Sequence, residues 1–292
     1  MSAESPRQQA TDAPGAPRPE TARALAAGTR PRRFGAWYVA EHRFRVMRSY
    51  LQTMLATGIG SPIIYLYGLG AGLASLIDAP VASQPGAEGV PYLVFVAPAL
   101  LASAAITVAT EEFSYPIMLG YKWNPTFTGM HASPIRPGQI VDGIVISVTV
   151  RILATSAVYY LFMLLFGAVP SPLGYLAVLA ATLGGLAFGH LLMAYVSTLE
   201  QDTGQIALVM RFLVLPMTLF SGTFFPLSQL PWFLQPIGWV SPLWHATELS
   251  RVFAYGYPEP LWLTVVHVVV LVAMAAVGWI ASRRIAARRL GR

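Results

Sequence analysis

Residues 152–199 read ILATSAVYYLFMLLFGAVPSPLGYLAVLAATLGGLAFGHLLMAYVSTL, a stretch of 48 residues without Asp, Glu, Lys or Arg. A helix needs about 20 apolar residues to cross the roughly 30 Å hydrocarbon core of a bilayer, so this stretch is long enough for two. The prolines of Val169-Pro170-Ser171-Pro172 favour a turn near its middle. The stretch therefore predicts two membrane helices, over residues 140–168 and 173–198.

The rest of the chain has the same character. Of its 292 residues, 55% are hydrophobic and 11% are charged, and the mean hydropathy is +0.57, which excludes an ordinary soluble domain. Further apolar runs predict spans over residues 50–77, 90–110, 205–225 and 260–281. The expected fold class is an all-α integral membrane protein with six transmembrane helices. Cysteine is absent, which excludes disulfides, thiolate metal sites and thiol nucleophiles.

The amino-terminal region divides at residue 35. Residues 1–34 mix Ala, Pro, Thr and Gln with six arginines and lack apolar periodicity, so we expect a disordered cytosolic tail. Residues 35–48 place apolar side chains at helical spacing and basic ones between them, which predicts an amphipathic interfacial helix. Residues 35–290 would then form one membrane domain.

The basic residues predict the orientation of the chain. With both termini and the loop after the second span in the cytosol, all but three of the 19 lysines and arginines lie inside. The exceptions are Arg151 and Arg211, which fall within predicted spans, and Arg251, which falls outside. We therefore expect a multi-pass protein of the cell (inner) membrane with both termini cytosolic.

Residues 225–256 lie outside by this topology but are largely apolar. Repeated prolines exclude one long helix, and Trp232, Trp239 and Trp244 favour the headgroup boundary. We expect two short re-entrant helices before span six, the second capped by Ser241 and ending near Gly256. The alternative is an ordinary outer loop lying on the membrane.

The loop between spans two and three predicts a short cytosolic helix. Trp123, Phe127 and Met130 fall at i, i+4 and i+7 and form an apolar ridge. One interpretation is a coupling helix that inserts into a soluble partner. The other is that the ridge packs on the protein's own helices.

Several kinds of chemistry are not indicated. The only lysine, Lys122, lacks the glycine-rich turn of a phosphate-binding loop, so no ATP site is expected in this chain. Glu111 and Glu112 are adjacent on a helix and diverge, which disfavours a general acid–base pair. His245 and Glu248 have the spacing of half a carboxylate metal site, but the other half is missing. A polar stripe with a Glu248–Arg251 pair is the simpler interpretation.

Charged and polar side chains inside spans need partners. Arg151 lies deep in the third span and should have an acidic partner among Glu111, Glu112, Glu200 and Asp202. Arg211 is shallower and can snorkel to the interface. His190 and His267 are lone histidines, for which packing and an interhelical hydrogen bond are the default.

Several blocks in order resemble the type-2 ABC exporter permeases, and in particular the NodJ lipo-oligosaccharide and daunorubicin-resistance permease branch. The similarity extends over about residues 35–290. The blocks are residues 61–73 (SPIIYLYGLGAGL), 95–102 (FVAPALLA), 112–117 (EFSYPI), 131–135 (HASPI), 220–227 (FSGTFFPL) and 242–249 (PLWHATEL).

The resemblance implies a permease that works with a P-loop nucleotide-binding subunit and a second permease copy. ATP and Mg would bind to the partner, so no cofactor is expected here. The resemblance also implies that Glu112 and the ridge Trp123, Phe127 and Met130 couple to the ATPase.

The family suggests that the first and fifth helices form the substrate path. Its expected residues are Tyr65, Tyr67, Thr223, Phe224, Trp239, His245 and Glu248. The exported substrate would be a lipo-oligosaccharide, polysaccharide or glycolipid, and drug efflux is the alternative. A membrane enzyme acting on lipid-linked sugars and an ion channel fit the sequence less well, because catalytic groups and filter motifs are not evident.

Overall fold

The computed structural model describes residues 19–73 and 89–291, and within those ranges every regular element is a helix. Four helices of this part are long and apolar enough to cross a membrane: Tyr92–Trp123 (α4 Tyr92–Phe113, α5 Tyr115–Met118 and η2 Leu119–Trp123), α7 Pro137–Leu165, α8 Leu176–Thr198 and α13 Leu261–Leu290. They correspond to the expected second, third, fourth and sixth spans. The all-helical membrane class is therefore confirmed.

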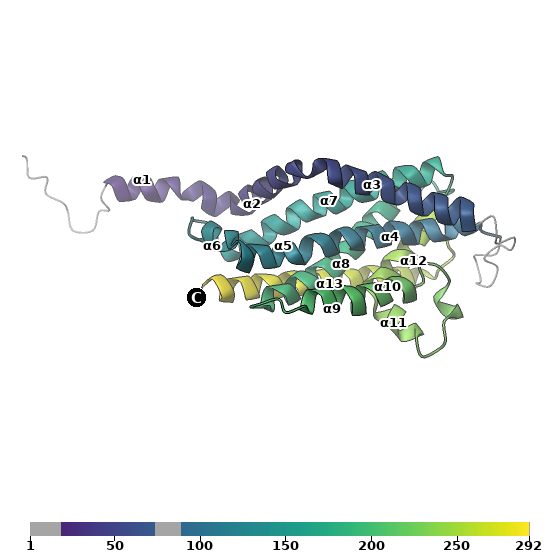
Figure 1. Cartoon of the computed structure of the whole chain (residues 1–292). Helices are drawn as coiled ribbons and strands as arrows, with labels where there is room; N and C mark the ends of the chain where they lie inside the picture. Colours follow the sequence, from purple (N-terminus) through teal and green to yellow (C-terminus); the bar gives the residue numbers. More distant parts are fainter. Residues whose placement is uncertain (1–18, 74–88, 292) are drawn as a thin grey trace, which may run out of the picture.

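The segments expected as the first and fifth spans are interrupted helices. The first consists of α3 Leu51–Tyr65, which contains Pro62, followed by the π-helix η1 Leu66–Leu73. The other runs through α9 Gln205–Val209, the π-helix η3 Met210–Val214 and α10 Leu215–Phe220. Figure 1 shows both lying alongside the four long helices. Residues 74–77, expected at the end of span one, lie outside the described part of the chain.

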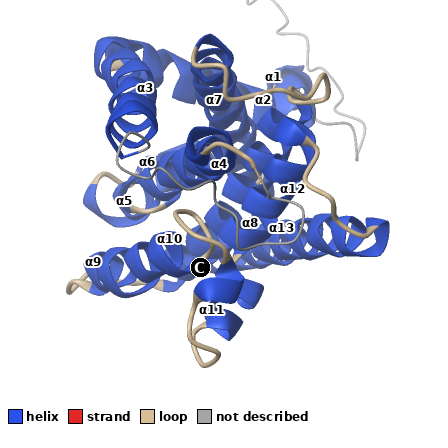
Figure 2. Cartoon of the chain, turned by 90° about the vertical axis from the view of Figure 1, so that its right-hand side faces the viewer, coloured by secondary structure: helices blue, strands red, loops and turns tan. Residues whose placement is uncertain are grey.

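α8 lies at the centre of the bundle, packed against α4, α12 (Pro242–Tyr255) and α13 (Figures 1 and 2). Small residues make these contacts close. A Cβ at Gly185 would lie 2.9 Å from the carbonyl oxygen of Ala105 on α4, and one at Gly278 of α13 would lie 2.5 Å from the backbone of His190. Because lipid tails are as apolar as these side chains, such close packing is a main source of helix association in membranes.

The amino-terminal helices differ from the expectation of a disordered tail over residues 1–34. Residues 1–18 lie outside the described part, but α1 covers Pro19–Ala27 and α2 covers Thr29–Ser49. The run of Ala, Leu and Arg over residues 22–27 has high helix propensity. A low content of apolar residues disfavours a buried core, but it does not prevent a helix. The expected interfacial helix over residues 35–48 forms the second part of α2.

α2 packs along α7. The Gln139 side chain donates a hydrogen bond to the Arg32 carbonyl oxygen at 2.8 Å, and Val39 lies against Gly143. Val39 and Ala40 are buried, whereas Trp37 is exposed. The side of α2 that packs against the protein therefore carries Val39 and Ala40, and Trp37, its largest apolar residue, lies outside this contact.

The segment between α10 and α13 contains η4 Leu227–Gln229, α11 Gln235–Val240 and α12. The Ser241 hydroxyl accepts a hydrogen bond from the Leu243 amide at 3.1 Å, and Pro242 occupies the first turn of α12. Gly256 ends α12 with a φ of +73°, a conformation that favours glycine. The predicted cap and stop of this helix are confirmed.

Candidate functional site

Four charged side chains from three helices meet inside the bundle. Arg151 of α7 forms ion pairs with Glu111, at 2.8 Å between Nη2 and Oε2, and with Glu112 on α4. Glu112 also pairs with Arg43 of α2. The prediction that Arg151 has an acidic partner is confirmed. Asp202, another candidate, instead accepts a hydrogen bond from the Gly204 amide at the start of α9.

The charges of this cluster balance. Glu112 is buried between the two guanidinium groups, while the side chain of Glu111 is about half exposed. Burial lowers the pKa of Arg43, and its contact with Glu112 opposes that shift. A buried ion is stabilised only when paired and hydrogen-bonded, so Glu112 holds two cations in place at once.

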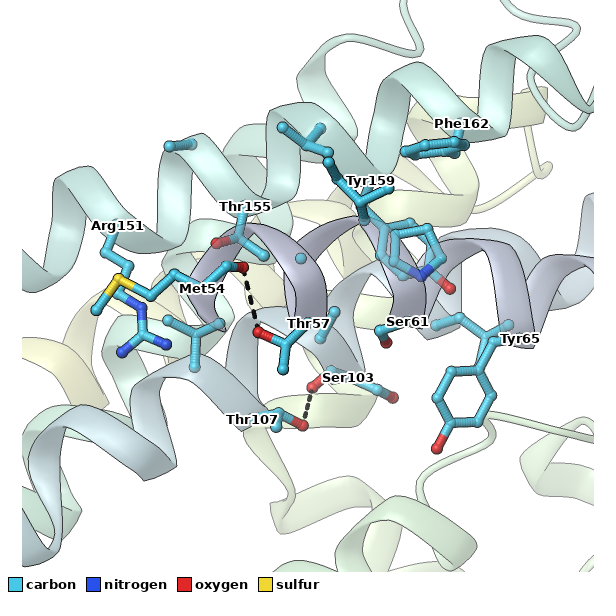
Figure 3. A pocket seen from close by; sticks show the side chains of 18 of the residues that line it. Met54, Thr57, Ser61, Tyr65, Ser103, Thr107, Arg151, Thr155, Tyr159 and Phe162 are labelled. Carbon is cyan, nitrogen blue, oxygen red and sulfur yellow. Dashed lines mark hydrogen bonds between the residues drawn. The ribbon is translucent and has the colours of Figure 1, made fainter. Parts of the chain in front are cut away.

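A cavity of about 660 Å³ begins at this cluster and runs between α3, α4 and α7. Figure 3 shows Arg151 at one end and Tyr65, Tyr159 and Phe162 toward the other. Thr218 of α10 and Phe224 after it also contribute to the lining. The cavity therefore touches both of the helical segments that were expected to form the substrate path.

The walls of the cavity are less polar than their hydroxyl groups suggest. Thr57, Ser103 and Thr107 donate their hydroxyls to the Thr53, Ala99 and Ser103 carbonyl oxygens of their own helices, at 2.9–3.0 Å. Figure 3 shows the bond from Thr107 to Ser103 and a second bond of Thr57, to the Met54 carbonyl oxygen at 3.2 Å. Tyr159 differs, because its hydroxyl is buried and has no hydrogen-bond partner within the described chain. The arrangement offers an apolar chamber, a buried hydroxyl without a partner in the described chain and an ionic end, which matches a molecule with an apolar tail and a polar head.

The expected substrate-path residues do not all meet in the cavity. Tyr65 and Phe224 line it. Tyr67 is exposed on η1, Trp239 is exposed on α11, and Thr223 is fully buried. The path expected from the sequence is therefore only partly assembled within one chain.

His245 and Glu248 lie away from the cavity and are buried. Glu248 pairs with Arg251 at 2.8 Å, as the sequence predicts, and Arg251 also donates to the Gly222 carbonyl oxygen at 2.7 Å. His245 contacts His267 and the Trp239 carbonyl oxygen. These contacts engage both residues inside the protein, and their place in the substrate path stays a prediction.

The expected coupling ridge is not formed as one exposed face. Helix α6 spans Thr126–His131, between the second and third spans as predicted. Phe127 is buried against Gly120 and edge-on to Tyr121, with ring centroids 4.9 Å apart. Trp123 is exposed and stacks on Tyr115, and Met130 is partly buried. The expectation that Phe127 inserts into a partner is thus wrong, because its ring already fills a space in its own chain.

Two contributors to the site were not predicted. Arg43 was expected on the wet side of an interfacial helix, and a basic residue facing lipid headgroups has the same sequence pattern as one facing Glu112. Tyr159 has no sequence signal beyond its position in an apolar helix.

Arg211 is exposed on η3, as a residue that snorkels to the interface would be. Among the described residues, no group of three or more His, Asp or Glu side chains could hold a metal ion.

Comparison with known proteins places this sequence in a family. The sequence model described as "ABC-2 type transporter" matches residues 38–255. Nodulation protein J of Rhizobium leguminosarum bv. viciae is 31% identical over 259 residues, covering 84% of this chain and 93% of that protein. Nodulation protein J of Rhizobium meliloti (strain 1021) is 29% identical, covering 83% and 91%, respectively. No solved structure matches the chain.

The family match covers most of the chain, including the helices that carry the ion cluster and the cavity. The resemblance to the NodJ branch is also confirmed, because the relatives match over most of both lengths. Together with the apolar spans, these matches identify a multi-pass membrane transport subunit. The chain is a membrane permease of the ABC-2 type transporter family.

Proposed function

We propose that this permease exports an amphiphilic substrate, with ATP hydrolysed on a separate nucleotide-binding subunit. The observation that carries the proposal is the cavity between α3, α4 and α7, which combines apolar walls with the Arg151–Glu111 pair at one end. A lipid tail fits the apolar part, and a polar head fits the ionic end. A lipo-oligosaccharide, polysaccharide or glycolipid is the proposed class, supported by relatives named nodulation protein J.

The proposed topology has six spans. The interrupted helices α3–η1 and α9–α10 would be the first and fifth, and both termini would be cytosolic in the cell (inner) membrane. Two observations support it: α1, α6 and the carboxyl end lie at one end of the bundle (Figure 1), and the basic residues concentrate in these segments. In this orientation α11 and α12 lie at the outer end, as the proposed re-entrant helices.

The ATP-binding partner would dock at the cytosolic end. The exposed Trp123, stacked on Tyr115 beside α6, is the proposed contact from this chain. Glu112, expected at the coupling contact, is buried in the ion cluster and would act by positioning α2, α4 and α7. A second permease copy would complete the substrate path, with Tyr67 and Trp239 available on the surface for it.

The test is substrate-stimulated ATP hydrolysis. The permease would be co-expressed with its ATP-binding subunit, reconstituted in proteoliposomes, and assayed with a lipo-oligosaccharide, a glycolipid and an amphiphilic drug. Stimulation by the sugar-bearing lipids supports the proposal, and stimulation only by the drug would favour the alternative of drug efflux. Saturable ATP binding by the permease alone, or no stimulation by any amphiphile, would overturn it.

A further inference from the structure

A buried histidine pair joins α12 to α13, away from the cavity described above. The Nδ1 atoms of His245 on α12 and His267 on α13 lie 2.6 Å apart. His245 is 4% exposed and His267 is fully buried. Two ring nitrogens at this distance must share a proton, because two lone pairs would repel.

The other ring nitrogens of the pair also have partners. Nε2 of His245 lies 3.0 Å from the carbonyl oxygen of Trp239 on α11. Nε2 of His267 lies 2.9 Å from Oε1 of Glu259, in the loop between α12 and α13. The second oxygen of that carboxyl accepts a hydrogen bond from the Thr264 hydroxyl at 2.8 Å. One chain of contacts therefore runs from α11 through α12 and α13 to residue 259.

Counting donors fixes how many protons this chain holds. A carbonyl oxygen only accepts, so the hydrogen of neutral His245 lies on Nε2 and its Nδ1 is an acceptor. The hydrogen between the two rings must then come from Nδ1 of His267. The His267–Glu259 contact needs a hydrogen as well, on either Nε2 or the carboxyl. Glu259 and His267 together thus hold two protons, as an imidazolium–carboxylate pair or as its neutral equivalent.

Among the described residues that surround the pair, none replaces a lost proton. Trp244 lies edge-on to both imidazoles, with ring centroids 5.0 and 4.8 Å away. α11 carries no ionisable side chain. On α12, Glu248 and Arg251 pair with each other, and on α8, His190 contacts the Ala275 carbonyl oxygen at 2.9 Å. On α4 the Tyr92 hydroxyl donates to the Phe224 carbonyl oxygen, and on α7 Asp142 pairs with Arg283.

Burial favours the neutral state of His245. α12 is too short to cross a membrane, and burial together with the nearby His267 lowers the pKa of His245 to about 4. The proton that the chain of contacts requires therefore resides on the Glu259–His267 pair.

We propose that one of the two protons held by Glu259 and His267 is removable and latches α11 and α12 to α13, and that its loss releases the α11–α12 segment. The latched state holds one proton more than the released state, so latching is favoured at low pH and weakens as the pH rises. This regulation is additional to the proposed export function and does not depend on it.

The test uses thiol labelling of the full-length chain, which has no cysteine of its own. Leu230, which is 8% exposed and precedes α11, would be replaced by Cys to report release. Trp232, which is 82% exposed, would be replaced by Cys in a parallel protein to correct for the pH dependence of maleimide chemistry. The measured quantity is the ratio of the two labelling rates between pH 5.5 and 9, with the protein in lipid nanodiscs.

We expect this ratio to rise roughly tenfold with pH, since an unmade buried hydrogen bond shifts an opening equilibrium by about that factor. Glu259→Gln should keep the ratio low at every pH. The glutamine amide would donate to Nε2 of neutral His267, so the one hydrogen of the His267 ring can lie on Nδ1 and bond to His245. His267→Gln should remove the pH dependence by taking away the ring that shares the removable proton. His190→Gln, at a buried histidine outside the chain of contacts, should behave as the parent.

Two results would overturn the proposal. One is a ratio that stays constant with pH in the parent protein. The other is a pH-dependent ratio that persists in Glu259→Gln. If His267→Gln fails to fold, the comparison of Glu259→Gln with His190→Gln still decides, because a merely structural role predicts release in Glu259→Gln and not a permanent latch.

Discussion

The guanidinium group of Arg251 lies over the ring of Phe95, with its Cζ atom 3.8 Å from the ring centroid. Arg251 is 1% exposed, and its other contacts are the carboxylate of Glu248 and the carbonyl oxygens of Phe95 and Gly222. One side chain thus joins α12, α4 and the turn after α10. In the proposed topology, this cation holds the outer ends of three segments together.

Replacing Arg251 by Gln should destabilise the protein strongly. Glu248 would be left buried without its cation, and removing one partner of a buried ion pair costs about 3–5 kcal/mol. The check is the apparent Tm of the purified permease in detergent. Arg45→Gln is the control, because the Arg45–Glu41 pair is exposed on α2 and its loss should leave the Tm nearly unchanged. Equal Tm values for the two variants would contradict the role given to Arg251.

Glu112 should matter more than its neighbour Glu111. Glu112→Gln leaves Arg43 without an ion-pair partner among the described residues and Arg151 with only the half-exposed Glu111 carboxylate, so we expect a loss of about 3–5 kcal/mol in stability. Glu111→Gln removes one solvent-screened contact and should cost under about 1 kcal/mol. Thermal unfolding of both variants in one detergent compares them. A larger effect of Glu111→Gln would show that the two carboxylates have exchanged roles.

The long apolar runs and the local capping signals of this chain were predictable from the sequence. The uncharged stretch over residues 152–199 predicts α7 and α8, and Ser241 and Gly256 predict the limits of α12. These features depend on nearby residues or on the thickness of the bilayer. The acidic partner of Arg151 was also predictable, because an unpaired arginine in a membrane is costly.

The partners of amphipathic faces were not predictable. Arg43 and Phe127 both lie on helices whose pattern shows which side is basic or apolar, but not what covers it. The periodicity of a sequence shows which side of a helix is apolar or basic. Only tertiary packing decides whether that side contacts lipid, a partner or the same chain. The helical state of residues 19–34 was missed for a related reason, because a low content of apolar residues disfavours a core but does not prevent a helix.

Gly278→Ala should loosen the contact between α13 and α8. The added Cβ would lie 2.5 Å from backbone atoms of His190 and Leu191, which cannot move aside, and overpacking of this kind costs about 1–3 kcal/mol. Gly60→Ala is the matched helical control, since nothing lies within 4 Å of its added Cβ and the change should stabilise α3 by about 0.5–1 kcal/mol. The expected Tm shifts therefore have opposite signs, and shifts of the same sign would contradict the packing.

Trp123 and Phe127 should have separable effects on the assembled transporter. Phe127→Ala empties a buried site and should lower stability by about 3–5 kcal/mol. Trp123→Ala changes an exposed ring and should leave the Tm nearly unchanged, but weaken co-purification of the ATP-binding subunit about tenfold, as expected for an aromatic contact residue. Normal co-purification with Trp123→Ala would move the partner's docking site elsewhere on the cytosolic end.

Filling the cavity should block an amphiphile without disturbing the bundle. Thr155 of α7 lines the cavity, so a tryptophan at this position would project into the space that the substrate tail is proposed to occupy. Val150 on the same helix is 49% exposed and does not line the cavity, which makes Val150→Trp the matched control. We expect Thr155→Trp to raise the substrate concentration for half-maximal ATPase stimulation at least about tenfold, equivalent to about 1.4 kcal/mol. Basal ATP hydrolysis should be unchanged, because the ion cluster and the cytosolic end keep their contacts. If Thr155→Trp and Val150→Trp respond to substrate alike, the substrate does not use this cavity.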